Sequence, residues 1–345
     1  MRNNKREMRN SKNMKNWLSS GWVMIGLSFI ICHLSFSEAQ AASRYDNPDT
    51  IVVARDGTGE FRTIAEAIEV CRAFMDYHKV IYVKKGTYKE KLIVPQWLQN
   101  IEICGEDRDQ TVITYDDHAN IKRPETGQPM GTFRTYTVKV EANAITFKNI
   151  TIENNSARLG QAVALHTEGD RLLFINCRFL GHQDTIYTGL EGTRLLFKDC
   201  YIEGTTDFIF GPSTAWFENC DIFCKANSYI TAASTPKDVK YGYVFNQCRI
   251  SCAEGIEKVY LGRPWRDYGY TLFMHCTLPR QIRPEGWHHW QKEREQTARY
   301  LEFENTGEGA ATEKRAAWTR QLTKKEAKEI TIENVFRRAD NWIIE

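Results

Sequence analysis

The sequence has few prolines and glycines, and no hydrophobic run long enough to cross a membrane. Nine Pro and 22 Gly among 345 residues exclude a collagen-like or low-complexity linker protein. The longest apolar run, residues 22–36, is interrupted by His33, whereas a spanning helix needs about 20 apolar residues. Hydrophobic residues make up 42% of the chain and charged residues 26%, as in ordinary globular proteins. We therefore expect one large core.

Outside its N-terminal 41 residues, the chain also lacks a large net charge of either sign. Residues 1–41 hold six Lys or Arg and two Glu, which leaves 40 bases and 42 acids in the rest of the chain. Nucleic-acid-binding proteins need a basic patch or stripe. The composition therefore predicts no nucleic-acid partner.

Residues 1–41 are typical of a secretory signal peptide. A basic flank precedes the apolar run, and Ala39-Gln40-Ala41 is a small-x-small cleavage site. The alternative is a membrane anchor, for which the run is short. We expect a signal peptide over 1–41, a single catalytic domain over 42–345, a secreted or periplasmic location and no stable membrane association.

One hexapeptide pattern recurs six times in the middle of the chain. It consists of Phe, any residue, a polar residue, Cys or Ile, any residue and an apolar residue. The copies begin at Phe147, Phe174, Phe197, Phe217, Phe245 and Phe273, with spacings of 27, 23, 20, 28 and 28 residues.

The parity of the pattern predicts a bend at its polar residue. The fourth and sixth positions share one strand face, but the first and fourth lie three apart and face opposite ways on a straight strand. Both point inward only if the chain turns at the polar residue, often Asn or Asp, which tolerate a left-handed corner. The repeat thus indicates an all-β solenoid, a parallel β-helix. A β-sandwich, the rival fold, repeats its pattern every 8–12 residues instead.

The same stacking predicts what the cysteines do and where the solenoid ends. Cys177, Cys200, Cys220, Cys248 and Cys276 should form a buried ladder, because one ligand per coil at one level makes a row and not a tetrahedral metal site. Cys224 and Cys252 stack too or form a disulfide. Short capping helices are expected over residues 61–71 and 323–338.

Two Asp-containing segments, residues 181–185 and 206–211, depart from the repeat. Asp184 lies ten residues after Phe174, and Asp207 lies ten after Phe197, so both occupy the same phase of consecutive coils. Adjacent strands are about 4.8 Å apart. Gln161, which is 23 residues before Asp184, extends the column, with Gln183 beside it.

A close carboxylate pair favours catalysis over a mere ladder of turn-capping side chains. Like charges this close push their pKa values apart, which is costly in a scaffold and useful in an enzyme. Arg263 can keep one Asp ionised through a bidentate pair, and Trp265 either stacks on a sugar or lies in the core. Two close carboxylates with neighbouring amides suit retaining glycoside hydrolysis or acyl transfer to an Asp nucleophile with amide donors to the oxyanion. The spacing of the residues does not distinguish these two reactions. A Gly-x-Ser-x-Gly elbow is absent.

At these residues the sequence resembles the pectin methylesterase family of carbohydrate esterases. The resemblance covers about residues 51–320. Five segments in family order carry it, namely Gly86–Glu90, Gly160–Leu165, Gly181–Thr185, Asp207–Gly211 and Leu261–Trp265. The family implies a right-handed parallel β-helix without a metal or organic cofactor. It further implies methyl-esterified homogalacturonan (pectin) as the partner, methanol and pectate as products, and we expect a monomer.

The resemblance also assigns roles to single residues. Asp207 corresponds to the nucleophile, Gln161 and Gln183 to the oxyanion donors, and Asp184 to the acid that then acts as base. Arg263 would orient Asp207, and Trp265 would stack on a galacturonate ring. Phe208, Tyr187 and Thr135 are also expected to contact substrate, although strand alternation can send Phe208 or Phe210 into the core. His166 and His182 are interpreted as structural.

Other functions remain open on the sequence. A polygalacturonase or lyase would share the fold, but a lyase needs a calcium-binding carboxylate cluster, for which two Asp and two Gln are a poor set. Thioesterase-like activity and a non-catalytic carbohydrate-binding solenoid are the further alternatives.

Overall fold

The computed structural model describes residues 43–340 and residue 342, and from Tyr45 onward the chain forms one compact unit. The predicted signal peptide at 1–41 lies outside the described residues. No helix among the described residues is long and apolar enough to cross a membrane.

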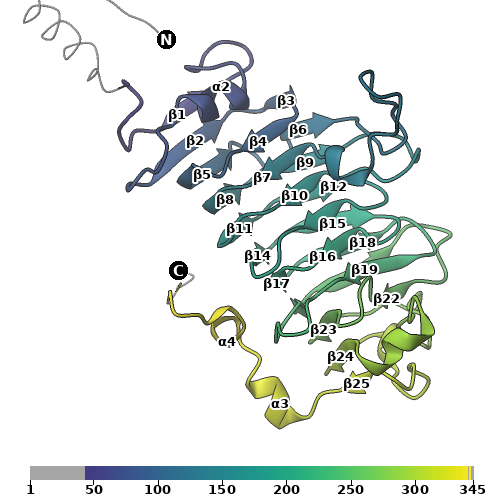
Figure 1. Ribbon diagram of the computed structural model, residues 1–345. Coiled ribbons are helices and arrows are strands. Elements are labelled where there is room, and N and C mark those ends of the chain that lie inside the picture. Colours follow the sequence, from purple (N-terminus) through teal and green to yellow (C-terminus); the bar gives the residue numbers. More distant parts are fainter. Residues whose placement is uncertain (1–42, 341, 343–345) are drawn as a thin grey trace, which may run out of the picture. The chain divides into compact units, whose positions relative to one another are not determined.

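Three parallel sheets build the unit, and successive strands along the chain alternate among them (Figure 1). The first sheet consists of β1 (Ile51–Val53), β2 (Lys79–Val83), β5 (Gln99–Gly105), β8 (Asn143–Lys148), β11 (Leu172–Ile175), β14 (Arg194–Lys198), β17 (Thr214–Glu218), β20 (Tyr243–Asn246), β23 (Tyr270–Met274), β24 (Arg299–Phe303) and β25 (Arg320–Gln321). The second sheet consists of β4 (Leu92–Val94), β7 (Val138–Val140), β10 (Leu165–Thr167), β13 (Ile186–Thr188), β16 (Ile209–Gly211), β19 (Tyr229–Ala233) and β22 (Tyr260–Gly262). The third sheet consists of β3 (Gly86–Lys89), β6 (Thr111–Tyr115), β9 (Thr151–Asn154), β12 (Arg178–Leu180), β15 (Tyr201–Gly204), β18 (Asp221–Cys224) and β21 (Arg249–Cys252). This is the right-handed parallel β-helix expected from the repeat and the resemblance.

The polar residue of each repeat makes the predicted corner between the first and third sheets. All six copies have left-handed backbone there, with φ between 50° and 55°, at Asn149, Asn176, Asp199, Asn219, Gln247 and His275. One left-handed residue turns the chain sharply, so that side chains on both sides of the corner point inward.

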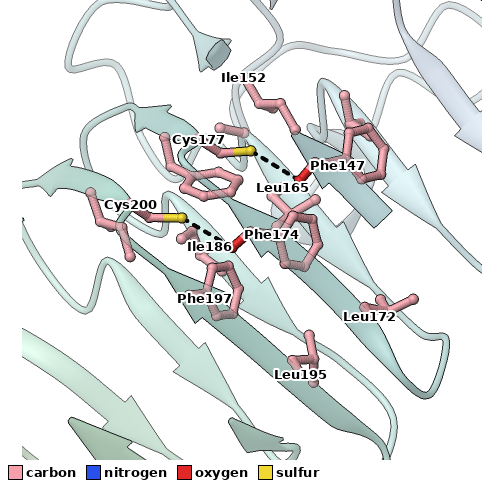
Figure 2. Close-up of a cluster of buried hydrophobic side chains, with 14 of the residues drawn as sticks. Phe147, Ile152, Leu165, Leu172, Phe174, Cys177, Ile186, Leu195, Phe197 and Cys200 are labelled. Carbon is pink, nitrogen blue, oxygen red and sulfur yellow. Dashed lines mark hydrogen bonds between the residues drawn. The ribbon is translucent and has the colours of Figure 1, made fainter. Parts of the chain in front are cut away.

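The six repeat phenylalanines form one stack through the core. They pair in register from β8 to β23, and successive ring centroids lie 4.3–5.6 Å apart. Figure 2 shows the start of the stack, with the Cys177 and Cys200 thiols donating to the carbonyls of Phe147 and Phe174 at 3.4 and 3.3 Å. Replacing one of these phenylalanines by alanine lowers the free energy of unfolding by about 3–5 kcal/mol.

The predicted cysteine ladder is present and fully buried. Cys224 and Cys252 are in register on β18 and β21, and all nine cysteines within the described residues are free thiols. The two therefore stack, and the disulfide alternative is not formed here.

A short helix caps the N-terminal end of the solenoid as predicted, whereas the predicted C-terminal cap is wrong, because the C-terminal helices lie along the side of the solenoid and not over its end (Figure 1). The N-terminal helix α2 (Ile64–Glu69) begins at a capping box of Thr63 and Glu66. The single helix expected over 323–338 is two, α3 (Lys324–Lys328) and α4 (Ile332–Phe336), because Thr331 caps a second start. Their apolar residues cover the outer face of the first sheet. Three 3₁₀ turns are η1 (Thr132–Arg134), η2 (Lys292–Gln296) and η3 (Glu308–Ala310).

Candidate active site

The predicted site residues come together where third-sheet strands pass into second-sheet strands. Gln161 precedes β10, Gln183 and Asp184 precede β13, and Asp207 precedes β16. Parallel strands of one sheet begin at the same edge. Residues at these junctions in successive coils therefore converge.

The two aspartates lie level with each other, as predicted. Ile186 pairs with Ile209, and the amide of Asp184 donates to the carbonyl of Thr206 at 3.1 Å. Both aspartates have left-handed backbone, with φ of 66° and 49°. They thus form consecutive rungs about one strand spacing apart.

The position of Gln161 differs from the prediction by one residue. The amide of Ala162 donates to the carbonyl of Gln183 at 3.1 Å, which places Gln161 beside Gln183 and not in the aspartate column. The prediction assumed a coil of 23 residues, but this coil is shorter: the hydrogen bond from Ala162 to Gln183 corresponds to an offset of 22 residues at Gln161, and the offset falls to 21 where Leu165 pairs with Ile186. The result is an amide pair next to a carboxylate pair.

All four side chains line one cavity of about 380 Å³. Its other lining residues are Thr132, Phe133, Phe210, Ala232, Arg263, Trp265 and Trp290. Carboxylates, amides and a guanidinium therefore share the cavity with four aromatic side chains.

Arg263 holds Asp207 in a two-pronged contact. Its Nε and Nη2 donate to Oδ1 and Oδ2 of Asp207 at 3.0 and 2.6 Å. Burial raises the pKa of Asp207, and the hydrogen bonds and charge of Arg263 oppose that rise. Of the two carboxyls, Asp207 is the one equipped to stay ionised.

Asp184 has the opposite environment. Burial first, and then the charge of Asp207, raise the pKa of Asp184 well above its usual range, against a smaller lowering by Arg263. One ionised and one protonated carboxyl, side by side, can act as nucleophile and acid. This pairing suits acyl transfer with the two amides as oxyanion donors.

Two predicted substrate contacts are wrong. Phe208 is 1% exposed and belongs to the hydrophobic core. It lies at the corner between the left-handed Asp207 and β16, where strand alternation does not apply. Phe208 and Ile209 both pack into the core, while Phe210 lines the cavity. Thr135 is fully buried, and its hydroxyl donates to the carbonyl of Thr132 and accepts from the amide of Val163. Phe133, two residues earlier, lines the cavity instead.

The remaining predicted contacts lie at or beside the cavity. Trp265 is half-buried and lines it, with its ring edge against Phe210 at 5.8 Å. Tyr187 packs between Phe133 and Phe210, 4.8 Å from each ring, and so supports two lining rings.

His166 and His182 lie outside the cavity, which agrees with their interpretation as structural residues. His166 is 3% exposed and its Nε2 lies 3.0 Å from Glu168, and burial lowers its pKa to about 4. Burial also lowers the pKa of His182. Within the described residues, no group of three or more His, Cys, Asp or Glu is arranged to hold a metal ion.

The sequence pattern assigned no role to Trp290 or Phe133, which both line the cavity. It also did not point to Tyr229, whose ring centroid lies 3.9 Å from the guanidinium carbon of Arg263. The available signal was spacing, because Tyr229 lies 22 residues after Asp207, about one coil.

Comparison with known proteins identifies the family. The sequence model of the family described as Pectinesterase matches residues 50–339. The chain belongs to the pectinesterase family. A probable pectinesterase/pectinesterase inhibitor of Brassica napus is 36% identical over 312 residues, which cover 86% of this chain and 52% of that protein. Pectinesterase 31 of Arabidopsis thaliana is 37% identical over 281 residues, 80% of this chain and 88% of that protein.

Solved structures of pectin methylesterases share the fold of this pectinesterase-family chain. The enzyme from carrot has a TM-score of 0.77 at 31% identity, covering 86% of this chain and 94% of that one. A pectin methylesterase in complex with a hexasaccharide has a TM-score of 0.71 at 29% identity, covering 83% and 96%. The chain spans about half the length of several plant relatives that it matches.

Proposed function

We propose that the protein is an exported pectinesterase that removes C6 methyl esters from homogalacturonan, giving methanol and pectate. The observation that carries the proposal is the Asp207 carboxylate, held in the fork of Arg263, beside the buried carboxyl of Asp184. Residues 1–41 would be removed on export, and residues 42–345 would act as a monomeric catalytic domain without a cofactor.

The first half of the reaction uses both carboxyls. A carboxylate oxygen of Asp207 attacks the ester carbonyl carbon, and the amide groups of Gln161 and Gln183 donate to the oxyanion of the tetrahedral intermediate. The intermediate collapses, the bond to the methoxy oxygen breaks, and Asp184 gives its proton to the departing methanol.

The second half restores the enzyme. Asp184, now ionised, takes a proton from water, whose oxygen attacks the acyl carbon bound to Asp207. Collapse breaks that bond, returns the Asp207 carboxylate and leaves the substrate as a free carboxylic acid. The aromatic cavity wall, with Trp265 and Phe210, offers flat faces to sugar rings.

The test is methanol release from highly methylated pectin in the presence of EDTA. Wild type should release methanol, and Asp207→Asn should not, while keeping its fold. Asp199→Asn is the matched control, because Asp199 has the same left-handed backbone at a corner where other coils carry Asn.

Other outcomes would point elsewhere. Unsaturated products that vanish with EDTA would indicate a calcium-dependent lyase, and shortened chains without methanol would indicate a polygalacturonase. Sugar binding without turnover would indicate a binding solenoid. No methanol from folded wild type overturns the proposal.

A further inference from the structure

Two aromatic rings hold Arg263 in addition to Asp207. The guanidinium carbon of Arg263 lies 3.9 Å from the ring centroid of Tyr229 and 3.8 Å from that of Trp290. Two rings this near one planar group must lie on its opposite faces, because they would clash on the same face. The N–H groups at the edge of the plane remain free to meet Asp207.

Tyr229 belongs to the strand that links the two partners through the backbone. Its carbonyl accepts a hydrogen bond from the amide of Asp207 at 2.8 Å, and the amide of Arg263 donates to the carbonyl of Thr231 at 2.9 Å. The backbone of β19 therefore holds the main chains of Asp207 and Arg263 through hydrogen bonds. The ring of Tyr229, on the same strand, fixes the plane of the Arg263 guanidinium. The ring itself is stacked on Tyr260, with centroids 5.2 Å apart.

Trp290 reaches Arg263 from a strained loop. Its φ of 59° is unusual for a bulky aromatic residue. Such strain persists only where neighbours enforce it, and it is common at functional sites. Here the Trp290 amide donates to Nδ1 of His288 at 3.0 Å. Arg294, 9% exposed, lies 5.8 Å from the Trp290 ring centroid and donates to the carbonyl of Pro264 at 2.8 Å, next to Arg263.

We propose that Tyr229 and Trp290 are positioning residues that clamp the guanidinium of Arg263 in the orientation that keeps Asp207 a carboxylate. The proposal rests on the proposed function, in which Asp207 is the nucleophile. An arginine side chain has many rotamers, and the two-pronged contact exists only when its plane is aligned with the carboxylate. Stacking between two rings removes the other orientations and adds cation–π attraction in a half-buried site.

The charged groups around Asp207 make the clamp measurable. Asp184 faces it from the preceding coil, and the buried Tyr300 hydroxyl is near enough to feel its charge. Around Arg263, burial lowers the pKa of His288, and the charges of His289, Arg263 and Arg283 lower it further. Among the described residues, Arg263 is the cation that donates to Asp207, so the protonation of Asp207 reports the placement of Arg263.

The experiment compares the pH profile of kcat/KM for pectin demethylation in Tyr229 variants. Tyr229 is chosen because Trp290 also lines the cavity and Tyr229 does not. Tyr229→Leu should move the acid limb up by about half to one pH unit and lower kcat/KM at acid pH about 3–10-fold. Tyr229→Phe, which keeps the ring, should restore the wild-type profile.

Tyr260→Leu is the matched control. It removes an aromatic ring from the same stack but leaves both rings that contact Arg263, and it should move the acid limb less than Tyr229→Leu does. Trp290→Leu is the second variant and should move the limb in the same direction as Tyr229→Leu, so the proposal stays testable if one variant does not fold.

An unmoved acid limb in folded Tyr229→Leu and Trp290→Leu overturns the clamp, as does an equal loss in Tyr229→Phe. Inactive wild type would instead refute the proposed function. In that case the clamp is tested by NMR on the ¹⁵N–¹H signal of Arg263 Nε. The signal is assigned by its disappearance in the Arg263→Lys variant. The signal should persist in Tyr229→Phe and be broadened or shifted in Tyr229→Leu, and an unchanged signal in Tyr229→Leu refutes the clamp.

Discussion

Replacing Arg263 by Gln should move the acid limb of the pH profile more than any other single substitution in the cavity. The change removes the cation and both hydrogen bonds to Asp207. Burial, which raises the pKa of Asp207, is then unopposed. Because the ionised form is the nucleophile, activity is lost as pH falls through this pKa, and a higher pKa moves the loss to higher pH.

The size of the effect follows from the geometry of the pair. Two unit charges about 4 Å apart interact by about 4 kcal/mol at an effective dielectric constant of 20, and one pKa unit corresponds to about 1.4 kcal/mol. The side chains are 20% and 8% exposed, so screening is modest. We expect the acid limb to move by about two pH units, which lowers kcat/KM about 100-fold at acid pH.

The assay is methanol release as a function of pH for wild type, Arg263→Gln and Arg263→Lys. Lysine keeps the charge but lacks the fork and should move the limb by less than the Gln variant. Arg249→Gln is the control, because Arg249 also pairs with an aspartate, Asp221, but on the exposed surface. Arg263→Gln with the acid limb of wild type would refute the electrostatic reasoning.

Three further predictions concern the other site and core residues. Asp184→Asn should lower kcat about 10²–10⁴-fold. In wild type, activity should fall as pH rises through the raised pKa of Asp184, since the protonated form is the acid; full activity of the variant would contradict its role. Gln161→Leu and Gln183→Leu should each lower kcat about 10²–10³-fold with little change in KM, measured by steady-state kinetics, and a pure KM effect would assign them to binding. Phe208→Ala should lower the free energy of unfolding by about 3–5 kcal/mol, whereas Phe210→Ala should mainly raise KM, about 2–10-fold; thermal melts and kinetics together distinguish the two, and the reverse pattern would place Phe208 at the substrate.

The corner residues explain why the fold was predictable from local pattern. A Phe and a Cys or Ile three residues apart face inward together only if one residue between them is left-handed, and Asn149, Asn176 and Asn219 supply it. Each coil repeats this solution, so the pattern is visible without knowledge of any long-range contact. The C-terminal segment lacks the repetition, and its break into two helices at Thr331 was not predicted.

In the site, the local pattern was enough to predict the aspartate column, because Asp184 and Asp207 have the same offset from the repeat. The level of Gln161 depends on the packing of the coils, because a coil shorter than 23 residues moves it from the level of Asp184 to that of Gln183. The burial of Phe208 was likewise visible only in the folded chain. The tertiary structure also decided the stacking of Arg263 between Tyr229 and Trp290. Offsets within a repeat follow from the local chain, whereas the register between coils, the residue at which a corner ends and a strand begins, and ring contacts across coils depend on how separate coils pack.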